Sequence, residues 1–322
     1  MKLNKITSYF FLAFIGISSV ACSQTKRSIA FYNVENLFDT QDDPKIDDAE
    51  FLPSAEREWN NERYNEKLKH INEVFELFNS PLIIGICEIE NEQVVRDIVN
   101  YDKLKANYGV VHYESIDERG IDVALIYDST SMKLIQSGII RYNMPEGDRP
   151  SRDIVWGKFL FGKDTIMGMV NHWPSRSGGE EASEPKRMIA ATAAREFIDS
   201  VQKYSPKTMI AFMGDLNDYP TNNSAKLIAE LLTPMITKES GEYKGSYNYR
   251  GEWDVLDHIM ISANFFSGKK VKAIKDSGKI YSNSFLLEVY KGDTVPFRTY
   301  GGKKYLGGYS DHLPVSIELG YR

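Results

Sequence analysis

The sequence Met213-Gly214-Asp215-Leu216-Asn217-Asp218-Tyr219-Pro220 follows a short apolar segment, Thr208–Phe212. An apolar run of this length, bounded by Pro206 and Pro220, is typical of a buried strand. Side chains alternate along a strand, so Asp215 and Asn217 are expected to point the same way at its end. In open α/β sheets, ligands bind in the crevice beyond the carboxyl ends of strands. A polar turn is the alternative interpretation, because Asp, Asn, Gly and Pro also favour turns.

Three more apolar runs end in polar side chains in the same way. They are Ile29–Tyr32 before Asn33, Leu82–Cys87 before Glu88, and Asp164–Val170 before Asn171 and His172. A glutamate directly after a run as apolar as Leu82–Cys87 is costly to bury unless it is paired, exposed or bound to a cation. This recurrence favours a ligand site over a simple polar turn.

The rest of the chain alternates predicted strands and helices, as in an α/β fold. Apolar runs predict strands at residues 119–127, 132–141, 153–161 and 253–261, and a final strand that begins at Asp311 and His312. Helices are predicted at residues 59–78, 92–99, 184–204 and 224–232; the first has apolar residues at spacings of three and four. Residues 267–304 are polar and predict one strand and a long surface loop.

The composition is that of an ordinary globular protein, with 322 residues, 42% apolar and 26% charged. Residues 26–322 contain no linker-like segment or internal repeat, so a single domain is predicted over residues 28–322. The formal net charge of −6 argues against tight non-specific binding to nucleic acid. It does not exclude an enzyme in which a metal ion supplies the positive charge at a phosphate.

Residues 1–21 have the pattern of a secretory signal peptide, with two lysines before an apolar run that is short for a membrane span. The small residues before Cys22 resemble a bacterial lipoprotein signal. They predict an exported, periplasmic or cell-surface protein that a lipid on Cys22 anchors to the membrane, with residues 22–27 as a tether. Such signals usually carry a large aliphatic residue at the position of Ser19, so cleavage after Ala21 and secretion as a soluble protein is the alternative.

Several side chains outside the main strand ends have open assignments. Arg119 either clamps a phosphate or pairs with Asp122. Arg176 or Arg187, near a Ser/Arg/Gly loop, could reach an acidic substrate. If Cys22 carries a lipid, Cys87 has no partner, so the fold is expected to lack disulfides and Cys87 to be a small buried apolar residue.

The polar groups predicted at strand ends suit metal-assisted chemistry on a phosphate. Carboxylates and amides without a Cys/His cluster favour a hard cation such as Mg²⁺ or Mn²⁺. A histidine can donate a hydrogen bond to a phosphate oxygen while a neighbouring aspartate fixes its tautomer. The sequence has neither a serine nucleophile elbow nor a phosphate-binding G-x-x-x-x-G-K-[ST] loop. The predicted reaction is therefore hydrolysis of a phosphoester by activated water.

Seven motifs, in their order along the chain, resemble the endonuclease/exonuclease/phosphatase superfamily, which has the deoxyribonuclease-I-like fold. They are NVEN, CEIEN, RGIDVALIY, NHWPS, GDLNDYP, LDHIMIS and GYSDHLPV, and the resemblance covers nearly all of residues 28–319. The NHWPSRSGG loop is similar to those of bacterial members usually described as extracellular nucleases. The resemblance implies a four-layer α-β-β-α sandwich of two mixed β-sheets flanked by helices, with one active site at their common edge.

The resemblance also implies a role for each matching residue. Asn33 and Glu88 would hold the metal, with Glu88 as the main ligand. Asp311 would support either the metal or the second histidine, and Glu35 is a further candidate ligand. Asp215 would orient or deprotonate the attacking water, Asn217 would steady the phosphate, and His172 and His312 would contact it. Asp257 would orient His312. The predicted substrate contacts are Arg119, Asn171 and Arg176.

Three functions are consistent with these residues. The first is an exported nuclease that hydrolyses DNA or RNA. The second is a phosphatase or phospholipase-type enzyme that acts on a phosphorylated sugar, inositol or lipid, which the acidic net charge and the membrane anchor favour. The third, an inactive binding protein, is disfavoured because every catalytic position of the motif set is filled. No obligate protein partner is evident.

Overall fold

The computed structural model describes residues 25–101 and 107–321. The predicted signal peptide and Cys22 lie outside the described residues. The predicted extent of the tether is wrong at its end, because strand β1 (Thr25–Leu37) begins at Thr25 and pairs there with Tyr321. No helix in the described part of the chain is long and apolar enough to cross a membrane.

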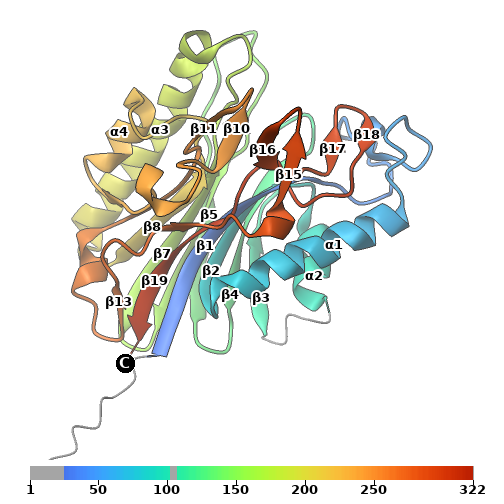
Figure 1. Cartoon of the computed structure of the whole chain (residues 1–322). Coiled ribbons are helices and arrows are strands. Elements are labelled where there is room, and N and C mark those ends of the chain that lie inside the picture. Colours follow the sequence, from blue (N-terminus) through green and yellow to red (C-terminus); the bar gives the residue numbers. More distant parts are fainter. Residues whose placement is uncertain (1–24, 102–106, 322) are drawn as a thin grey trace, which may run out of the picture.

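Two large mixed sheets pack face to face in the centre of the molecule (Figure 1). The first has the order β13-β19-β1-β2-β4-β3, with β14 also beside β19. Its other strands are β2 (Pro81–Ile89), β3 (Tyr108–His112), β4 (Asp122–Asp128), β13 (Val271–Ala273), β14 (Lys279–Ile280) and β19 (Val315–Tyr321). β1 and β2 run parallel, which carries both strands towards the same edge of the sheet.

The second sheet has the order β5-β6-β7-β8-β12-β9. Its strands are β5 (Lys133–Ile140), β6 (Ile154–Phe161), β7 (Asp164–His172), β8 (Met209–Asp215), β9 (Thr233–Pro234) and β12 (Asp257–Ile261). β7 and β8 run parallel, and β12 pairs antiparallel with β8 so that Asp257 lies beside Asp215. β8 is buried along its whole length, which confirms the buried strand predicted there.

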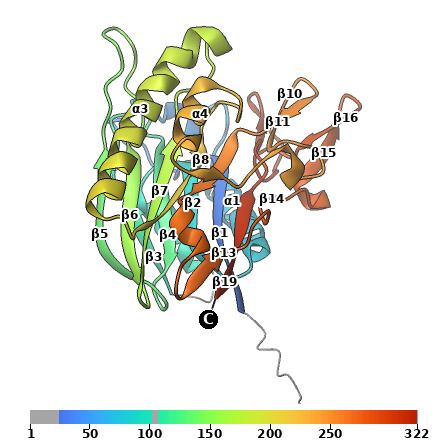
Figure 2. The same cartoon turned by 90° about the vertical axis from the view of Figure 1, so that its left-hand side faces the viewer.

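Helices cover the outer face of each sheet, as Figures 1 and 2 show from two sides. α1 (Asn61–Phe75) and α2 (Glu92–Asn100) pack on the first sheet, and α3 (Glu180–Tyr204) and α4 (Asn223–Ala229) on the second. The predicted four-layer α-β-β-α architecture is therefore confirmed. α3 begins earlier than predicted, at Glu180 instead of Glu184. Glutamates in its first turn favour this start, because negative charge stabilises the N-terminus of a helix.

The main hydrophobic core lies between the two sheets and continues between the first sheet and its helices α1 and α2. A second apolar cluster lies between the second sheet and its helices α3 and α4. Cys87 is fully buried in the main core as a free thiol, as predicted. Together these cores hold both sheets rigidly against each other. Functional groups at the strand ends therefore rest on a scaffold whose geometry is fixed by packing.

The segment 267–304 contains more structure than the single strand and long loop predicted. It holds the hairpin β15 (Leu287–Tyr290)/β16 (Asp293–Pro296) and the small pair β17 (Tyr300–Gly301)/β18 (Lys304–Tyr305). A further hairpin, β10 (Tyr247–Tyr249)/β11 (Glu252–Asp254), precedes β12, so the strand predicted over 253–261 is divided. Short polar strands have too few apolar residues to form a recognisable pattern, so only the turn residues between them indicate a hairpin.

Candidate active site

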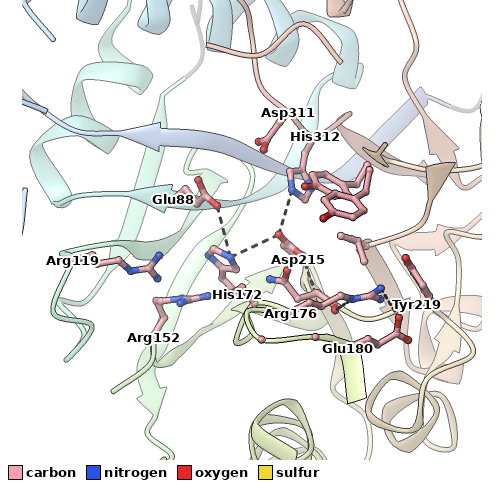
Figure 3. A pocket seen from close by; sticks show the side chains of 17 residues that line it. Glu88, Arg119, Arg152, His172, Arg176, Glu180, Asp215, Tyr219, Asp311 and His312 are labelled. Carbon is pink, nitrogen blue, oxygen red and sulfur yellow. Dashed lines mark hydrogen bonds and ion pairs between the residues drawn. The ribbon is translucent and has the colours of Figure 1, made fainter. Parts of the chain in front are cut away.

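A cavity of about 660 Å³ opens where β2, β7 and β8 end. Figure 3 shows Glu88, His172, Asp215 and His312 pointing towards one another in it. All but three of the predicted site residues line this cavity, namely Glu88, Arg119, His172, Arg176, Asp215, Asn217, Asp311 and His312. The other three, Asn33, Asn171 and Asp257, are buried behind its wall.

Glu88 reaches the cavity because a β-bulge turns it out of the sheet. The register of β2 with β1 shifts between Asn33 and Leu37, and its register with β4 shifts between Cys87 and Ile89. Glu88 itself has a φ of 63°, a left-handed conformation that residues other than glycine seldom adopt. Bulges beside active sites often re-aim a side chain in this way.

Asp215 is placed by the close packing of β8 on β7. A Cβ atom on Gly214 would lie 2.3 Å from the carbonyl oxygen of Asn171, so the position has no room for a side chain. The backbone N–H of Asn217 donates to Asp215 Oδ1 at 2.9 Å, and Asn217 Nδ2 donates to the Trp173 carbonyl at 3.1 Å. Asp215 and Asn217 both reach the cavity, as expected, but not by alternation along one strand: β8 ends at Asp215, and a turn with a φ of 48° at Asn217 brings Asn217 there.

Asn33 ties the two central carboxylates together. Its Nδ2 donates to Glu88 Oε1 and to Asp215 Oδ2, both at 3.1 Å. Its Oδ1 accepts the backbone N–H of Glu35 at 3.0 Å, and the side chain is fully buried. Asn33 thus positions Glu88 and Asp215 through its amide hydrogens. Its predicted role as a metal ligand stays a prediction, because the amide oxygen accepts one hydrogen bond and keeps a second lone pair.

His312 and Asp257 form a hydrogen-bonded pair in the cavity wall. His312 Nδ1 lies 2.8 Å from Asp257 Oδ2, and His312 Nε2 lies 3.6 Å from Asp215 Oδ2. Burial lowers the pKa of His312, but the charges of Asp257 and Asp215 outweigh burial and hold that pKa well above its ordinary value. The arrangement has the geometry expected of an aspartate that orients a histidine.

His172 faces the same carboxylates as a neutral ring. Its Nε2 lies 3.8 Å from Glu88 Oε1 and 3.7 Å from Asp215 Oδ2. Burial, with the nearby charges of Arg152 and Arg119, lowers the pKa of His172 well below its ordinary value. His172 Nδ1 is buried with no hydrogen-bond partner among the described residues, so we place the proton of the neutral ring on Nε2. Environments that push two pKa values apart in this way divide acid and base roles.

The donor set fits a divalent cation that prefers oxygen ligands. Burial raises the pKa of Asp215 to about 7, against the opposing charge of His312, and Asp257 and Glu88 add to the increase. Glu88, Asp215 and Asp311 all line the cavity, and a hard cation would offset the repulsion among these carboxylates together with the lining arginines. Ligand atoms of Asp215, Asp257 and His312 lie within 4.8 Å of one another. Glu88 and Asp311 line the same cavity and offer further carboxylate oxygens to such an ion.

Arg119 and Arg152 are held at the cavity by Asp117. Arg119 donates from Nε and Nη2 to the two Asp117 oxygens at 3.1 and 3.0 Å, and Arg152 Nη1 donates at 3.1 Å. Burial raises the pKa of Asp117, but these hydrogen bonds and charges outweigh burial and lower it. Asp122, the alternative partner considered for Arg119, instead accepts the N–H of Ser115. Arg152 was not predicted, and its only sequence signal is its place just before β6.

Arg176 lines the cavity, whereas Arg187 does not. The Arg176 guanidinium lies 3.6 Å from the centre of the Tyr219 ring, and its Nε donates to the Asn217 carbonyl at 2.7 Å. Arg187 is fully buried in α3, with its Nε 2.7 Å from Asp218 Oδ1. The prediction that Arg187 could reach a substrate is therefore wrong. The ion pair fastens the loop after β8 to α3.

Asn171 is also a structural residue, which corrects its predicted contact with substrate. It is fully buried, its Nδ2 donates to the Met213 carbonyl at 3.0 Å, and its Oδ1 accepts Trp173 Nε1 at 3.2 Å. Both polar ends of the amide are thus used inside the wall. Asn171 joins β7 to β8 and fixes Trp173.

A partly buried network of polar side chains that sequence reasoning missed connects Asp311 to α1. Arg298 donates from Nη2 to Asp311 Oδ2 at 2.9 Å, and from Nε to Glu35 Oε1 at 3.4 Å. Glu35 also accepts the backbone N–H of Thr299 at 2.6 Å, and the buried Lys67 of α1 donates to the Thr299 hydroxyl. Glu35 does not line the cavity, so the structure does not favour it as a metal ligand. Its carboxylate holds the segment at Arg298 and Thr299 against the site.

A family model described as "Endonuclease/Exonuclease/phosphatase family" matches residues 28–321. A solved protein of that family from Bacteroides thetaiotaomicron has 15% sequence identity and a TM-score of 0.58, over 93% of this chain and 99% of that chain. A mannosyl-6-phosphatase of Bacteroides thetaiotaomicron VPI-5482 has 14% identity and a TM-score of 0.58, over 91% and 99%. The human nocturnin catalytic domain, solved with bound sulfate, has 13% identity and a TM-score of 0.56, over 93% and 96%.

No curated protein sequence matches the chain. At such low identity, the solved structures show that the fold is shared, and fold alone does not determine function. The family match, by contrast, spans nearly all of the described residues, and the cavity gathers acidic and imidazole groups able to hold a metal ion. Family and site together support a metal-dependent phosphoester hydrolase. The chain belongs to the endonuclease/exonuclease/phosphatase family.

Proposed function

We propose that the protein is an exported, divalent-metal-dependent phosphodiesterase that hydrolyses DNA or RNA. The observation that carries this proposal is the convergence of Glu88, His172, Asp215 and His312 in one open cavity. Glu88, His172 and Asp215 come from strands of both sheets and His312 lies just before β19, and Glu88 is at a strained, bulged position that packing must maintain. Such convergence of costly polar groups is typical of a catalytic site.

Each residue has a step that its geometry supports. Asp215 orients the attacking water and accepts its proton, because its Oδ2 faces the cavity between the two imidazoles. His312, held by Asp257 at Nδ1, donates from Nε2 to a phosphate oxygen and returns a proton to the leaving oxygen. His172 donates a hydrogen bond from Nε2 to another phosphate oxygen. Donors fixed in place before reaction stabilise the developing charge more than mobile ones.

The remaining polar groups hold the phosphate. Glu88 and Asp311 would hold Mg²⁺ or Mn²⁺, which when bound supplies positive charge to the phosphate oxygens. Asn217 donates one hydrogen of its amide NH₂ group to the Trp173 carbonyl, and it would donate the other to a phosphate oxygen. Arg119 and Arg176 line the same cavity and complement its negative charge.

The shape of the cavity favours a diester over a terminal phosphate. A second cavity, of about 920 Å³, shares Tyr247, Tyr249 and Asp311 with the first, so the cleft continues beyond the reacting position. A phosphomonoester ends at its phosphate and needs no such continuation. A polymer occupies space on both sides of the phosphorus, which supports a nucleic-acid substrate.

The geometry of an anchored chain argues against a lipid substrate. We propose, as above, that a lipid on Cys22 anchors the protein, with Ser23 and Gln24 separating it from Thr25 at the start of β1. β1 then runs to Asn33 beside the site, a span of roughly 26 Å at about 3.3 Å per residue. The short anchor would hold the far end of β1 at the membrane and leave the cavity facing away from it.

A phosphatase acting on a phosphorylated sugar is the second candidate, because the net charge of −6 disfavours a polyanionic substrate. A mannosyl-6-phosphatase among the proteins of similar fold is consistent with this candidate, although the likeness extends only to the fold. The two candidates differ in their dependence on salt. An enzyme that contacts several phosphates loses affinity steeply as salt increases, whereas one that binds a single small phosphate does not.

The proposal is tested by incubating purified protein with plasmid DNA, RNA, a phosphoinositide, sphingomyelin and mannose 6-phosphate in Mg²⁺. We expect cleavage of DNA or RNA, loss of that cleavage in excess EDTA, and its return when Mg²⁺ is restored. KM for the nucleic acid should increase steeply between 50 and 200 mM salt. Over this range, a protein that contacts about six phosphates loses about 10³-fold in affinity. Hydrolysis of the sugar phosphate or a lipid, with no cleavage of nucleic acid in any divalent cation, would contradict the nuclease assignment.

A further inference from the structure

Two hairpins beside the active site end in the same kind of turn. The β10/β11 turn is Tyr249-Arg250-Gly251-Glu252, and the β15/β16 turn is Tyr290-Lys291-Gly292-Asp293. In both, the two central residues have positive φ, with 53° and 89° in the first and 52° and 95° in the second. These values match the tight turn that suits the twist of a hairpin and that takes glycine at its second central position. The chain thus presents a tyrosine followed by a cation at two neighbouring tips.

Both tips belong to one groove, the second cavity described above. β10 lies beside β16, and the two hairpins stand side by side in Figures 1 and 2. Tyr249, Arg250, Tyr290 and Lys291 all line this groove. Tyr249 also lines the active-site cavity, so the groove leads directly to the reacting position.

The tyrosines are exposed rings with a cation stacked on each. Tyr249 and Tyr290 are 57% and 56% exposed, although large aromatic side chains usually bury their surface. The Arg250 guanidinium and the Lys291 ammonium each lie 5.1 Å from the centre of the neighbouring ring. Within residues 25–101 and 107–321, neither cation makes an ion pair with a carboxylate. The rings and charges are therefore available to a ligand.

We propose that this groove binds a single-stranded segment of nucleic acid that continues from the scissile phosphate, with bases stacked on Tyr249 and Tyr290. The proposal rests on the nuclease function proposed above and adds the form of the substrate. Bases stack on aromatic side chains only when they are unpaired, and single-strand binding proteins combine such rings with a cationic path for the backbone. Arg250 and Lys291 provide that path at the two tips.

The balance of charge in the groove explains why stacking should dominate. Glu288 and Asp293 line the groove together with its cations, so its net positive charge is small. Arg298 is already engaged by Glu35 and Asp311. Electrostatic attraction alone would then hold a polyanion weakly, and the exposed rings must supply most of the affinity. A double helix hides its base faces and could use only the weak charge.

The test compares two substrates, the small diester bis(4-nitrophenyl) phosphate and the oligonucleotide (dT)15. The quantity to compare is kcat/KM on (dT)15 divided by kcat/KM on the small diester. In Tyr249→Ala/Tyr290→Ala this ratio should fall at least about tenfold, because each lost stack weakens binding by about fivefold or more.

The second variant, Arg250→Asn/Lys291→Asn, tests the cations. The slope of log KM against log salt should decrease by about 1.4, because each lost contact with a single strand contributes about 0.7. Asparagine tolerates positive φ, so these substitutions preserve the turns.

The matched control is Lys203→Asn/Tyr204→Ala. Lys203 also lies 5.0 Å from the centre of an exposed ring, Tyr204, but at the end of α3 and near the start of β8, far from the cavity. This variant should leave both the ratio and the salt slope unchanged. Wild-type protein should also cleave (dT)15 faster than the same strand paired with (dA)15.

The outcomes separate the two proposals. If the wild type hydrolyses neither substrate in Mg²⁺ or Mn²⁺, the proposed nuclease function fails. If it cleaves both, but the tyrosine variant changes the ratio no more than the control does, the groove inference is overturned. Equal cleavage of single and double strands also overturns it. A third outcome is that the tyrosine variant lowers the ratio but the Arg250→Asn/Lys291→Asn variant leaves the salt slope unchanged. This result would contradict a role for the two cations in binding the backbone and would point to a neutral chain, such as a glycan.

Discussion

Replacing Asp215 with asparagine is expected to lower kcat by about 10³-fold or more, since a positioned general base contributes about 10²–10⁴-fold. Asparagine keeps the shape of the side chain and can still accept the N–H of Asn217, so the turn after β8 should persist. It cannot accept a proton from water. Because burial raises the pKa of Asp215 to about 7, loss of its charge should not lower the free energy of unfolding at pH 7. Initial rates and urea unfolding measure the two effects separately.

The control for this substitution is Asp199→Asn, which removes a carboxylate on the exposed face of α3 where it pairs with Arg195. This variant should retain wild-type kcat. Full activity in purified Asp215→Asn protein would contradict the assigned role. A large decrease in the free energy of unfolding for Asp215→Asn would show instead that Asp215 is mainly structural.

The largest expected effect on stability comes from Arg187→Met. The Arg187–Asp218 ion pair has no exposed side-chain surface, with Arg187 Nε 2.7 Å from Asp218 Oδ1. Methionine keeps much of the length of the side chain but takes away the closest cation of the buried Asp218 carboxylate, which keeps only the Ser224 hydroxyl and Arg176 Nη2, 3.8 Å away, among the described residues. Breaking a buried pair from one side costs about 3–5 kcal/mol. Urea unfolding should therefore show a loss of this size, with activity reduced only in proportion to the folded fraction.

Arg195→Met on the same helix is the matched control. Arg195 pairs with Glu230 and Asp199 at the surface, where an ion pair contributes about 0–1 kcal/mol. Adding Asp218→Asn to Arg187→Met should recover part of the lost stability, because it removes the stranded charge. A loss below about 1 kcal/mol for Arg187→Met, or a further loss in the double variant, would contradict the account of this pair.

Much of the fold could be predicted because its signals are local. Apolar runs such as Leu82–Cys87 and Thr208–Phe212 mark buried strands, and their abrupt change to Glu88 and Asp215 marks the site. The resemblance to a known family then supplied the four-layer order of the sheets. The short hairpins between residues 241 and 305 were missed, because polar strands of two to four residues have no apolar pattern to reveal them.

The roles of several site residues depend on long-range contacts that no local pattern encodes. Lys67 meets Thr299 across 232 positions of sequence, and this contact helps hold Asp311. Arg187 lies between the half-buried Lys186 and Met188 of α3 yet is fully buried, because Asp218 lies against that face. Asn33 has the expected location, but which of its amide atoms faces Glu88 follows only from the folded arrangement.

The central claim is that Glu88 holds a divalent cation beside Asp215 and His312, and binding of Mn²⁺ followed by electron paramagnetic resonance tests it most directly. Glu88→Gln removes the charge from the bulged carboxylate while keeping its size, and Glu181→Gln on the exposed first turn of α3 is the control. We expect Glu88→Gln to weaken Mn²⁺ binding by at least about tenfold, since hard cations depend on charged oxygen ligands. The control should bind like the wild type. Equal Mn²⁺ affinity in wild type and Glu88→Gln would contradict the account.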